Sequence, residues 1–166
     1  MNTGGSPWLT KFAVDLVTAS ETDLRSDITL GGKLLLGRES KLEVCYAPFE
    51  HVGRTARVVL LGITPGRQQA TNALLEARRQ LISGADHATA LTAAKAYASF
   101  SGPLRSNLVA MLDFIGLNSR LGLQSSATLW GSDNGSVHFT SALRFPVFVD
   151  GKNYSGQPGI ASTPCW

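Results

Sequence analysis

Apolar residues recur at helical spacing in several stretches of the chain. Glycine and polar residues lie between these stretches. In residues 8–19, 70–81 and 103–115 they fall at every third or fourth position, which gives each stretch one apolar face and predicts a helix. Residues 86–97 are rich in alanine, the residue with the highest helix propensity, and predict a further helix. Glycines follow shortly after 70–81 and 103–115, as expected where helices end.

The most apolar segment is the run from Val58 to Leu61, which contains no polar residue. Such a run predicts a strand of parallel sheet that is covered on both faces. A tight loop, residues 62–66, and the helix predicted over 70–81 follow directly. Strand, loop and helix in this order predict the opening of an α/β unit.

Shorter patterns predict the remaining elements. Alternating apolar and polar residues favour strands over 41–46 and 137–143. The Asp-Gly pair at 150–151 suits a type I′ turn and predicts a hairpin over 147–154. Residues 117–134 are polar and contain glycine, so they predict a loop, and the end of the chain, rich in glycine and proline, predicts irregular structure.

Composition narrows the class of protein. The chain has 166 residues, of which 43% are apolar and 16% charged, enough for the core of one ordinary domain. Its net charge of +3 is too small to identify a nucleic-acid binder by itself. No apolar run approaches the roughly 20 residues that span a bilayer, there is no signal-peptide pattern, and Cys45 and Cys165 are too few for a disulfide framework. We therefore expect a single domain over residues 1–166, located in the cytoplasm.

The loop at 62–66 is the first candidate for chemistry. Ligands of open α/β sheets bind beyond the carboxyl ends of the strands, where this loop is expected. Its glycines let a ligand approach the backbone, the following helix offers free N–H groups, and Arg67 adds a positive charge. These features point to an anion or a nucleotide-like ligand, although a plain strand-to-helix turn has the same composition. The loop is neither a Walker loop nor the Gly-x-Gly-x-x-Gly fingerprint of dinucleotide sites.

Three stretches, in the same order along the chain, resemble motifs of the uracil-DNA glycosylase superfamily. The first is Val-Val-Leu-Leu-Gly-Ile-Thr-Pro-Gly at 58–66, similar to the strand and the Gly-x-Asn-Pro-Gly loop of mismatch-directed and single-strand-selective members. The second is Phe-Ser-Gly at 100–102, before a predicted helix that ends in Ile-Gly-Leu. The third is Val-His-Phe-Thr-Ser-Ala-Leu-Arg at 137–144, similar to the second core strand of the family.

The resemblance implies a fold and a partner. The fold is a three-layer α/β/α arrangement around a short, mainly parallel central sheet. The partner is DNA, single- or double-stranded, from which the protein receives a flipped-out base, because the glycosidic bond is inaccessible inside the stack. No cofactor or metal takes part in the hydrolysis, and two distant cysteines cannot hold the iron–sulfur cluster that some branches carry on four.

Family roles carry over to individual residues. Thr64 lies where other members place the residue that positions the attacking water. Phe100 fits the ring that stacks on the base, and Ser141 lies at the position of the asparagine that reads the base edge. The rest of the expected base pocket is formed by Gly62, Ile63, Pro65 and Gly66. Contacts with the DNA backbone are expected from Arg67, Arg144 and Lys152.

The sequence departs from the family pattern at particular points. Thr64 has a hydroxyl in place of a carboxylate or an amide, and Ser141 reaches less far than an asparagine. The later His-Pro-Ser motif has no counterpart, so we expect a chain that lacks the C-terminal part of the domain. An incomplete sheet leaves an exposed edge, which favours a homodimer.

Three functions therefore stay open. The first is a glycosidase that excises a damaged or deaminated base from DNA. The second is a catalytically inactive module of the same fold that binds a nucleotide or nucleic acid, which the residues at Thr64 and Ser141 favour. The third is an α/β domain that serves assembly only and has no ligand.

Overall fold

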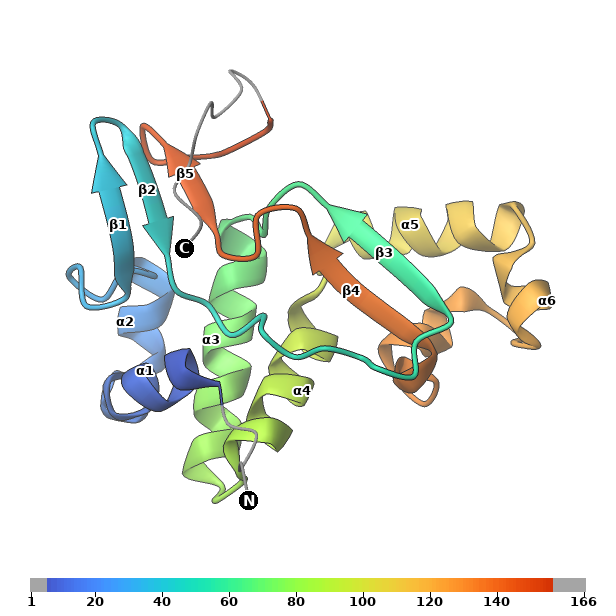
Figure 1. Ribbon diagram of the computed structural model, residues 1–166, viewed down its shortest axis with the longest axis horizontal. Helices are drawn as coiled ribbons and strands as arrows, with labels where there is room; N and C mark the ends of the chain where they lie inside the picture. Colours follow the sequence, from blue (N-terminus) through green and yellow to red (C-terminus); the bar gives the residue numbers. More distant parts are fainter. Residues whose placement is uncertain (1–5, 157–166) are drawn as a thin grey trace.

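The computed structural model of the chain describes residues 6–156, which form a mixed α/β structure (Figure 1). The α-helices are α1 (Pro7–Thr18), α2 (Glu21–Ser26), α3 (Arg67–Ile82), α4 (His87–Ala98), α5 (Pro103–Phe114) and α6 (Leu117–Leu121). The strands are β1 (Leu35–Glu39), β2 (Leu42–Cys45), β3 (Val58–Gly62), β4 (Val137–Ser141), β5 (Val147–Val149) and β6 (Lys152–Asn153). Short 3-10 helices are η1 (Ser126–Trp130) and η2 (Asn134–Ser136).

The strands form two sheets. The strands β1, β2, β5 and β6 make an antiparallel sheet in that order. The strands β3 and β4 pair in parallel, with Val58 opposite Val137 and Gly62 opposite Ser141. The mixed α/β class and a parallel strand after residue 57 are thus confirmed. The mainly parallel arrangement that the sequence predicts holds only for this pair, because the other strands within residues 6–156 are antiparallel.

Tight turns explain why β1 pairs with β2, and β5 with β6, in antiparallel orientation. Asp150 and Gly151 have φ values of 51° and 70°, the left-handed values that a type I′ turn requires, so the predicted hairpin is confirmed. Ser40, with a φ of 53°, lies in the turn between β1 and β2. Turns as short as these join antiparallel neighbours, whereas parallel strands need a long crossover.

The helices α1, α3, α4 and α5 confirm the three helices that the apolar spacing predicts and the one that the alanine content predicts. The Asp86 carboxylate caps α4 by accepting a hydrogen bond from the N–H of Thr89 at 2.7 Å. Helices α3 and α4 pack against each other (Figure 1). In the part of the chain that the structure describes, no helix combines the length and the apolar character needed to cross a membrane.

Residues 117–134 are more ordered than the loop that their polar composition predicts. They contain α6 and η1. Gly116 and Gly122 flank α6 with left-handed φ values of 78° and 77°. The Asp113 carboxylate, at the end of α5, accepts a hydrogen bond from the N–H of Ser126 at 2.6 Å and so fixes the start of η1. The pattern misses these elements because they are short and depend on a partner in another helix.

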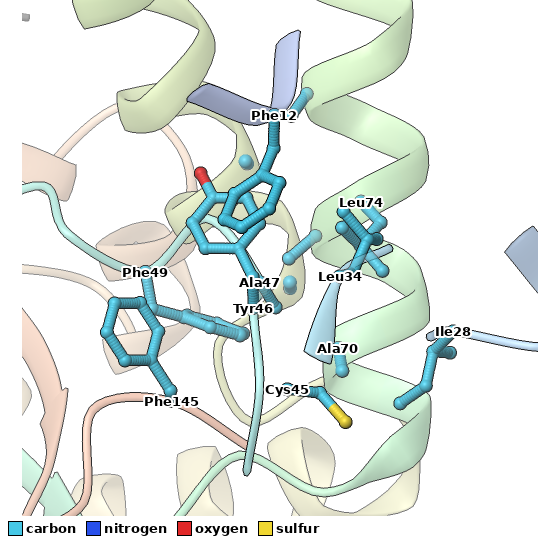
Figure 2. Packing of buried hydrophobic residues seen from close by; sticks show 14 of the residues in the cluster. Phe12, Ile28, Leu34, Cys45, Tyr46, Ala47, Phe49, Ala70, Leu74 and Phe145 are labelled. Carbon is cyan, nitrogen blue, oxygen red and sulfur yellow. The ribbon is translucent and has the colours of Figure 1, made fainter. Parts of the chain in front are cut away.

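The main hydrophobic core gathers side chains from α1, α3, α4 and β2. In it the rings of Phe12 and Tyr46 pack with their centroids 4.6 Å apart (Figure 2). Cys45 is fully buried in the same cluster, and burial raises the pKa of its thiol to about 11. Cys45 is therefore a packing residue, whereas Cys165 and the predicted irregular end of the chain from residue 157 lie outside the described residues.

A smaller cluster lies against one face of the parallel pair. Val137 and Phe139 of β4 are buried there, and the Phe139 ring stacks on Trp130 with the centroids 4.7 Å apart. The opposite face of β3 is open, since Val59 and Leu61 are 59% and 66% exposed. Within the described residues β3 is thus covered on one face, not on both as its apolar run predicts.

Candidate functional site

The carboxyl ends of β3 and β4 lie side by side, because the two strands are parallel and in register (Figure 1). Backbone pairing continues beyond them, where the N–H of Ala142 donates to the Gly62 carbonyl and the N–H of Leu143 donates to the Ile63 carbonyl, both at 2.9 Å. The chain leaves this edge toward α3 on one strand and toward β5 on the other. An α/β unit favours a ligand site at this edge.

A small pocket adjoins this edge. Its lining includes Pro65, Phe100 and Ser141, which the sequence predicts as ligand contacts, together with Lys95 and Arg144. The enclosed space is about 20 Å³, on the scale of one water molecule. The structure therefore brings four of the predicted residues together around a narrow cavity, since Arg144 is predicted as a contact with the DNA backbone.

Gly62, at the end of β3, lies close to Phe100 and Ser141. A Cβ at Gly62 would be 3.4 Å from Ser141 Oγ and 3.6 Å from Phe100 Cε1. The lack of a side chain at residue 62 lets the ring and the hydroxyl lie close to the end of β3. Within residues 6–156, Ser141 Oγ forms no hydrogen bond, so its donor and both lone pairs are available to a ligand.

The backbone of Phe100 has an unusual conformation. Its φ of 52° lies in the left-handed region, which bulky side chains rarely adopt. The N–H of Phe100 donates to Gln69 Oε1 on α3 at 3.2 Å. The carbonyl of Ser99 accepts hydrogen bonds from the Trp130 indole at 2.8 Å and from Arg105 at 2.9 Å. These hydrogen bonds fix the peptide group that joins Ser99 to Phe100 and so hold a strained backbone at the pocket. Strain of this kind clusters at ligand sites.

The two charged residues that line the pocket, Lys95 and Arg144, are both cations. Lys95 lies on α4, is 5% exposed, and donates from its ammonium group to the carbonyl of His51. Burial first, and the charge of Arg144 second, lower the pKa of Lys95 to about 8. The pocket therefore suits an electron-rich or anionic ligand.

Lys95 lies outside the sequence motifs that predict the site. This lysine stands in an alanine-rich helix, on the face that buries Leu91, Ala94 and Ala98. A lysine on an otherwise apolar helical face is the signal that could have found it, because lysines are almost never fully buried without a partner.

Thr64 is not among the residues that line the pocket. Its hydroxyl donates to the Phe145 carbonyl at 3.0 Å and accepts from the N–H of Val147 at 3.2 Å. These bonds tie the loop after β3 to the segment that leads into β5. A hydroxyl oxygen has two lone pairs, so one acceptor position remains. The role of Thr64 in positioning a water stays a prediction.

The start of α3 has partners within the protein. Asn153 Oδ1 accepts a hydrogen bond from the N–H of Arg67 at 2.9 Å, and a Cβ at Gly66 would be 3.1 Å from Asn153 Nδ2. The Arg67 guanidinium donates to the Gly151 carbonyl at 3.2 Å and lies over the Phe148 ring, 4.8 Å from its centroid. The side chain of Asn153 thus occupies the end of the helix where the sequence predicts an anion.

Ile63, Arg67 and Lys152 are predicted site residues that are not part of the pocket lining. Ile63 is 51% exposed, and its Cδ1 would be 3.5 Å from a Cβ at Gly156. Lys152 is exposed on β6. Of the three residues expected to contact the DNA backbone, Arg144 lines the pocket, whereas Arg67 and Lys152 lie at the β5–β6 hairpin. Their contacts with DNA stay a prediction.

A second cavity adjoins the first and shares Lys95 with it. His51 and His138 line this cavity, and burial lowers the pKa of both imidazoles, which favours their neutral forms. The His138 Nδ1 accepts from the N–H of Gly53 at 3.3 Å. In the described ranges, no group of three or more His, Cys, Asp or Glu side chains is placed to hold a metal ion.

Fold and pocket together define a mixed α/β protein with a cationic pocket at the carboxyl end of a parallel strand pair. Over 131 residues the chain is 39% identical to the uncharacterized protein YoxB of Bacillus subtilis (strain 168). The match covers 78% of this chain and 51% of YoxB, so the chain spans about half the length of the curated relative it matches. No protein-family model and no solved structure matches the chain.

Proposed function

We propose that the pocket binds a nucleobase, presented in a nucleotide or flipped out of DNA. This proposal rests on one observation. At the carboxyl edge of the parallel pair, a single pocket is lined by Phe100, by two cations and by Ser141, whose hydroxyl forms no hydrogen bond within residues 6–156. Stacking on an aromatic ring contributes about 1–3 kcal/mol per base. The hydroxyl can donate to or accept from a base edge, and Lys95 and Arg144 attract phosphate or carbonyl oxygens.

The resemblance of three sequence stretches to the uracil-DNA glycosylase superfamily supports the same proposal. In this proposal the described residues belong to a three-layer α/β/α fold of that type, of which β3 and β4 supply one parallel pair. The hydrogen bonds of the Thr64 hydroxyl favour binding without turnover. A base needs more room than the enclosed 20 Å³, so we expect the exposed Arg144 side chain to move when a ligand enters.

The two cations favour base excision as a second candidate. Hydrolysis of a glycosidic bond leaves negative charge on the departing base, and positive groups aimed at that charge stabilise the transition state. Lys95 and Arg144 line the pocket in which the base would lie. The remaining lone pair of Thr64 Oγ1 would then hold the attacking water.

Fluorescence anisotropy tests binding. The probes are labelled single- and double-stranded oligonucleotides that carry uracil, hypoxanthine or xanthine, each compared with an unmodified strand. We expect Phe100→Ala to weaken binding by about tenfold or more, because the stacking surface is lost. The matched control is Phe114→Ala on α5, which removes a ring that is 92% exposed and outside the pocket lining. Equal affinity of Phe100→Ala and the unmutated chain overturns the proposal.

Alkali treatment of the same mixtures separates binding from excision. Alkali breaks DNA at abasic sites, so strand breaks that depend on the protein report that a base has been removed. Breaks at one of the modified bases support excision. Intact strands for every base, together with tight binding, leave the chain as a binding module.

A further inference from the structure

Lys95 is a buried amine that forms no ion pair within residues 6–156. Its side chain is 5% exposed. The charged and titratable groups that face it are Glu50, Arg144, His51 and His138. The charge of Glu50 favours the ammonium form, whereas burial and the charge of Arg144 oppose it.

This environment raises the fraction of Lys95 that is neutral, and the neutral amine is the nucleophilic form. An ordinary lysine, with a pKa of about 10.4, is only about 0.1% neutral near pH 7.5. The pKa of Lys95 is lowered to about 8. A pKa of that size leaves roughly a quarter of the molecules with a neutral amine near pH 7.5.

Lys95 lies at the wall of two adjoining cavities. Lys95 lines both the pocket with Phe100 and Ser141 and the adjoining cavity with His138. The Lys95 Nζ donates a hydrogen bond to the carbonyl of His51, which orients Nζ without supplying a negative charge. The unbonded Ser141 hydroxyl in the same pocket can hydrogen-bond to a bound carbonyl oxygen.

We propose that the Lys95 amine forms a Schiff base with an aldehyde in this pocket, namely the ring-opened sugar of an abasic nucleotide. The choice of this aldehyde rests on the proposed function, because a pocket that binds a base also receives C1′, the sugar atom that carries the base. The Nζ lone pair attacks C1′ and a proton moves from nitrogen to the carbonyl oxygen. The resulting carbinolamine loses water and gives the imine. No oxidant or reductant takes part, and hydrolysis reverses the reaction.

Reductive trapping tests the proposal. The full chain is incubated with an oligonucleotide that contains an abasic site and with sodium cyanoborohydride, which reduces the imine to a stable amine. We expect a covalent protein–DNA adduct, which peptide mapping assigns to Lys95 with about tenfold or greater preference over the exposed Lys33 and Lys41. Lys95→Arg keeps a cation but cannot form an imine, so the adduct should be lost. Lys33→Arg is the matched control and should retain it.

A second probe separates this proposal from the proposed function. Free 2-deoxyribose 5-phosphate offers the same aldehyde without an oligonucleotide, and anisotropy reports separately whether the abasic oligonucleotide binds. If the oligonucleotide binds but the reduced adduct is absent, or is spread over exposed lysines and the amino terminus, the Schiff base is overturned while the proposed function stands. If the oligonucleotide fails to bind but the sugar phosphate is still trapped on Lys95, the proposed function fails and the Schiff base is supported. The peptide map of the unmutated chain decides the matter if Lys95→Arg does not fold.

Discussion

Gly62 and Phe100 meet beside the pocket, where a Cβ at residue 62 would lie 3.6 Å from Phe100 Cε1, at ordinary van der Waals distance. The site therefore has room for a methyl group but not for a branched side chain. We expect Gly62→Ala to change the free energy of unfolding little. Gly62→Val should lower it by about 1–3 kcal/mol, because the added methyl groups displace the ring. Urea unfolding followed by tryptophan fluorescence measures both changes.

Gly135 provides the matched pair for this test. The nearest atom to a Cβ at Gly135 is Thr55 Oγ1, at 3.8 Å, and the glycine has no left-handed φ. The difference in stability between the valine and alanine variants should therefore be smaller at residue 135 than at residue 62. Equal differences at the two positions would show that Gly62 makes no special room for Phe100.

The strained backbone of Phe100 predicts an order of stability between two variants. A left-handed conformation costs a residue with a Cβ about 1–2 kcal/mol, and glycine does not incur this cost. We therefore expect Phe100→Gly to be more stable than Phe100→Ala by about 1 kcal/mol in urea unfolding, although both lose the ring. The same pair at Phe139, which lies in a strand, should show the opposite order. An alanine variant as stable as the glycine variant at residue 100 contradicts the strain.

The hydroxyl of Thr64 predicts a structural cost for its removal. Thr64→Val keeps the shape of the side chain but leaves the Phe145 carbonyl and the Val147 N–H without their partner. We expect the free energy of unfolding to fall by about 1–3 kcal/mol. Thr64→Ser keeps both hydrogen bonds and should lose less. If Thr64→Val unfolds like the unmutated chain while base excision falls, Thr64 acts on the substrate instead.

Periodic and local signals accounted for the elements that were predicted correctly. The helix from Arg67 to Ile82 has an apolar face that any packing partner can bury, and the Asp-Gly pair at 150–151 sets the backbone of its own turn. β1 went unpredicted, because Leu35–Glu39 becomes a strand only through its pairing with β2. The open face of β3 also escaped prediction, since a run of apolar residues shows what can be buried but not what covers it.

The candidate site was predictable only in part. Pro65, Phe100 and Ser141 do lie together at the end of the parallel pair, as their places in the sequence motifs predict. Lys95 reaches the same pocket from α4, outside those motifs, and its low exposure comes from contacts with distant segments such as His51. Thr64 belongs to the first motif but does not line the pocket. Only the three-dimensional arrangement reveals that its hydroxyl bridges two backbone groups.

The pKa of Lys95 predicts a specific dependence of stability on pH. This pKa is about 8 in the folded chain, below its ordinary value of 10.5, so between these two pH values the unfolded chain binds more protons than the folded chain. The cost of burying the ammonium group is therefore fully present below pH 8 and is relieved as the pH rises toward 10.5. Relative to Lys95→Met, the unmutated chain should gain stability over this window in urea unfolding. Lys33→Met, at an exposed lysine, should leave the change in the free energy of unfolding with pH as it is in the unmutated chain.

The outer edges of the parallel strands β3 and β4 predict that two copies of the chain form a dimer. Within residues 6–156, β3 and β4 pair only with each other, so each strand has an outer edge that can pair with a second copy. The exposed Val59 and Leu61 on β3 add apolar surface beside that edge. We expect light scattering to give twice the chain mass of 17.6 kDa. Leu61→Lys should shift the protein to a monomer, whereas Met111→Lys, at a residue 64% exposed on α5, should not. A mass of 17.6 kDa for the unmutated chain at every concentration contradicts pairing through this edge.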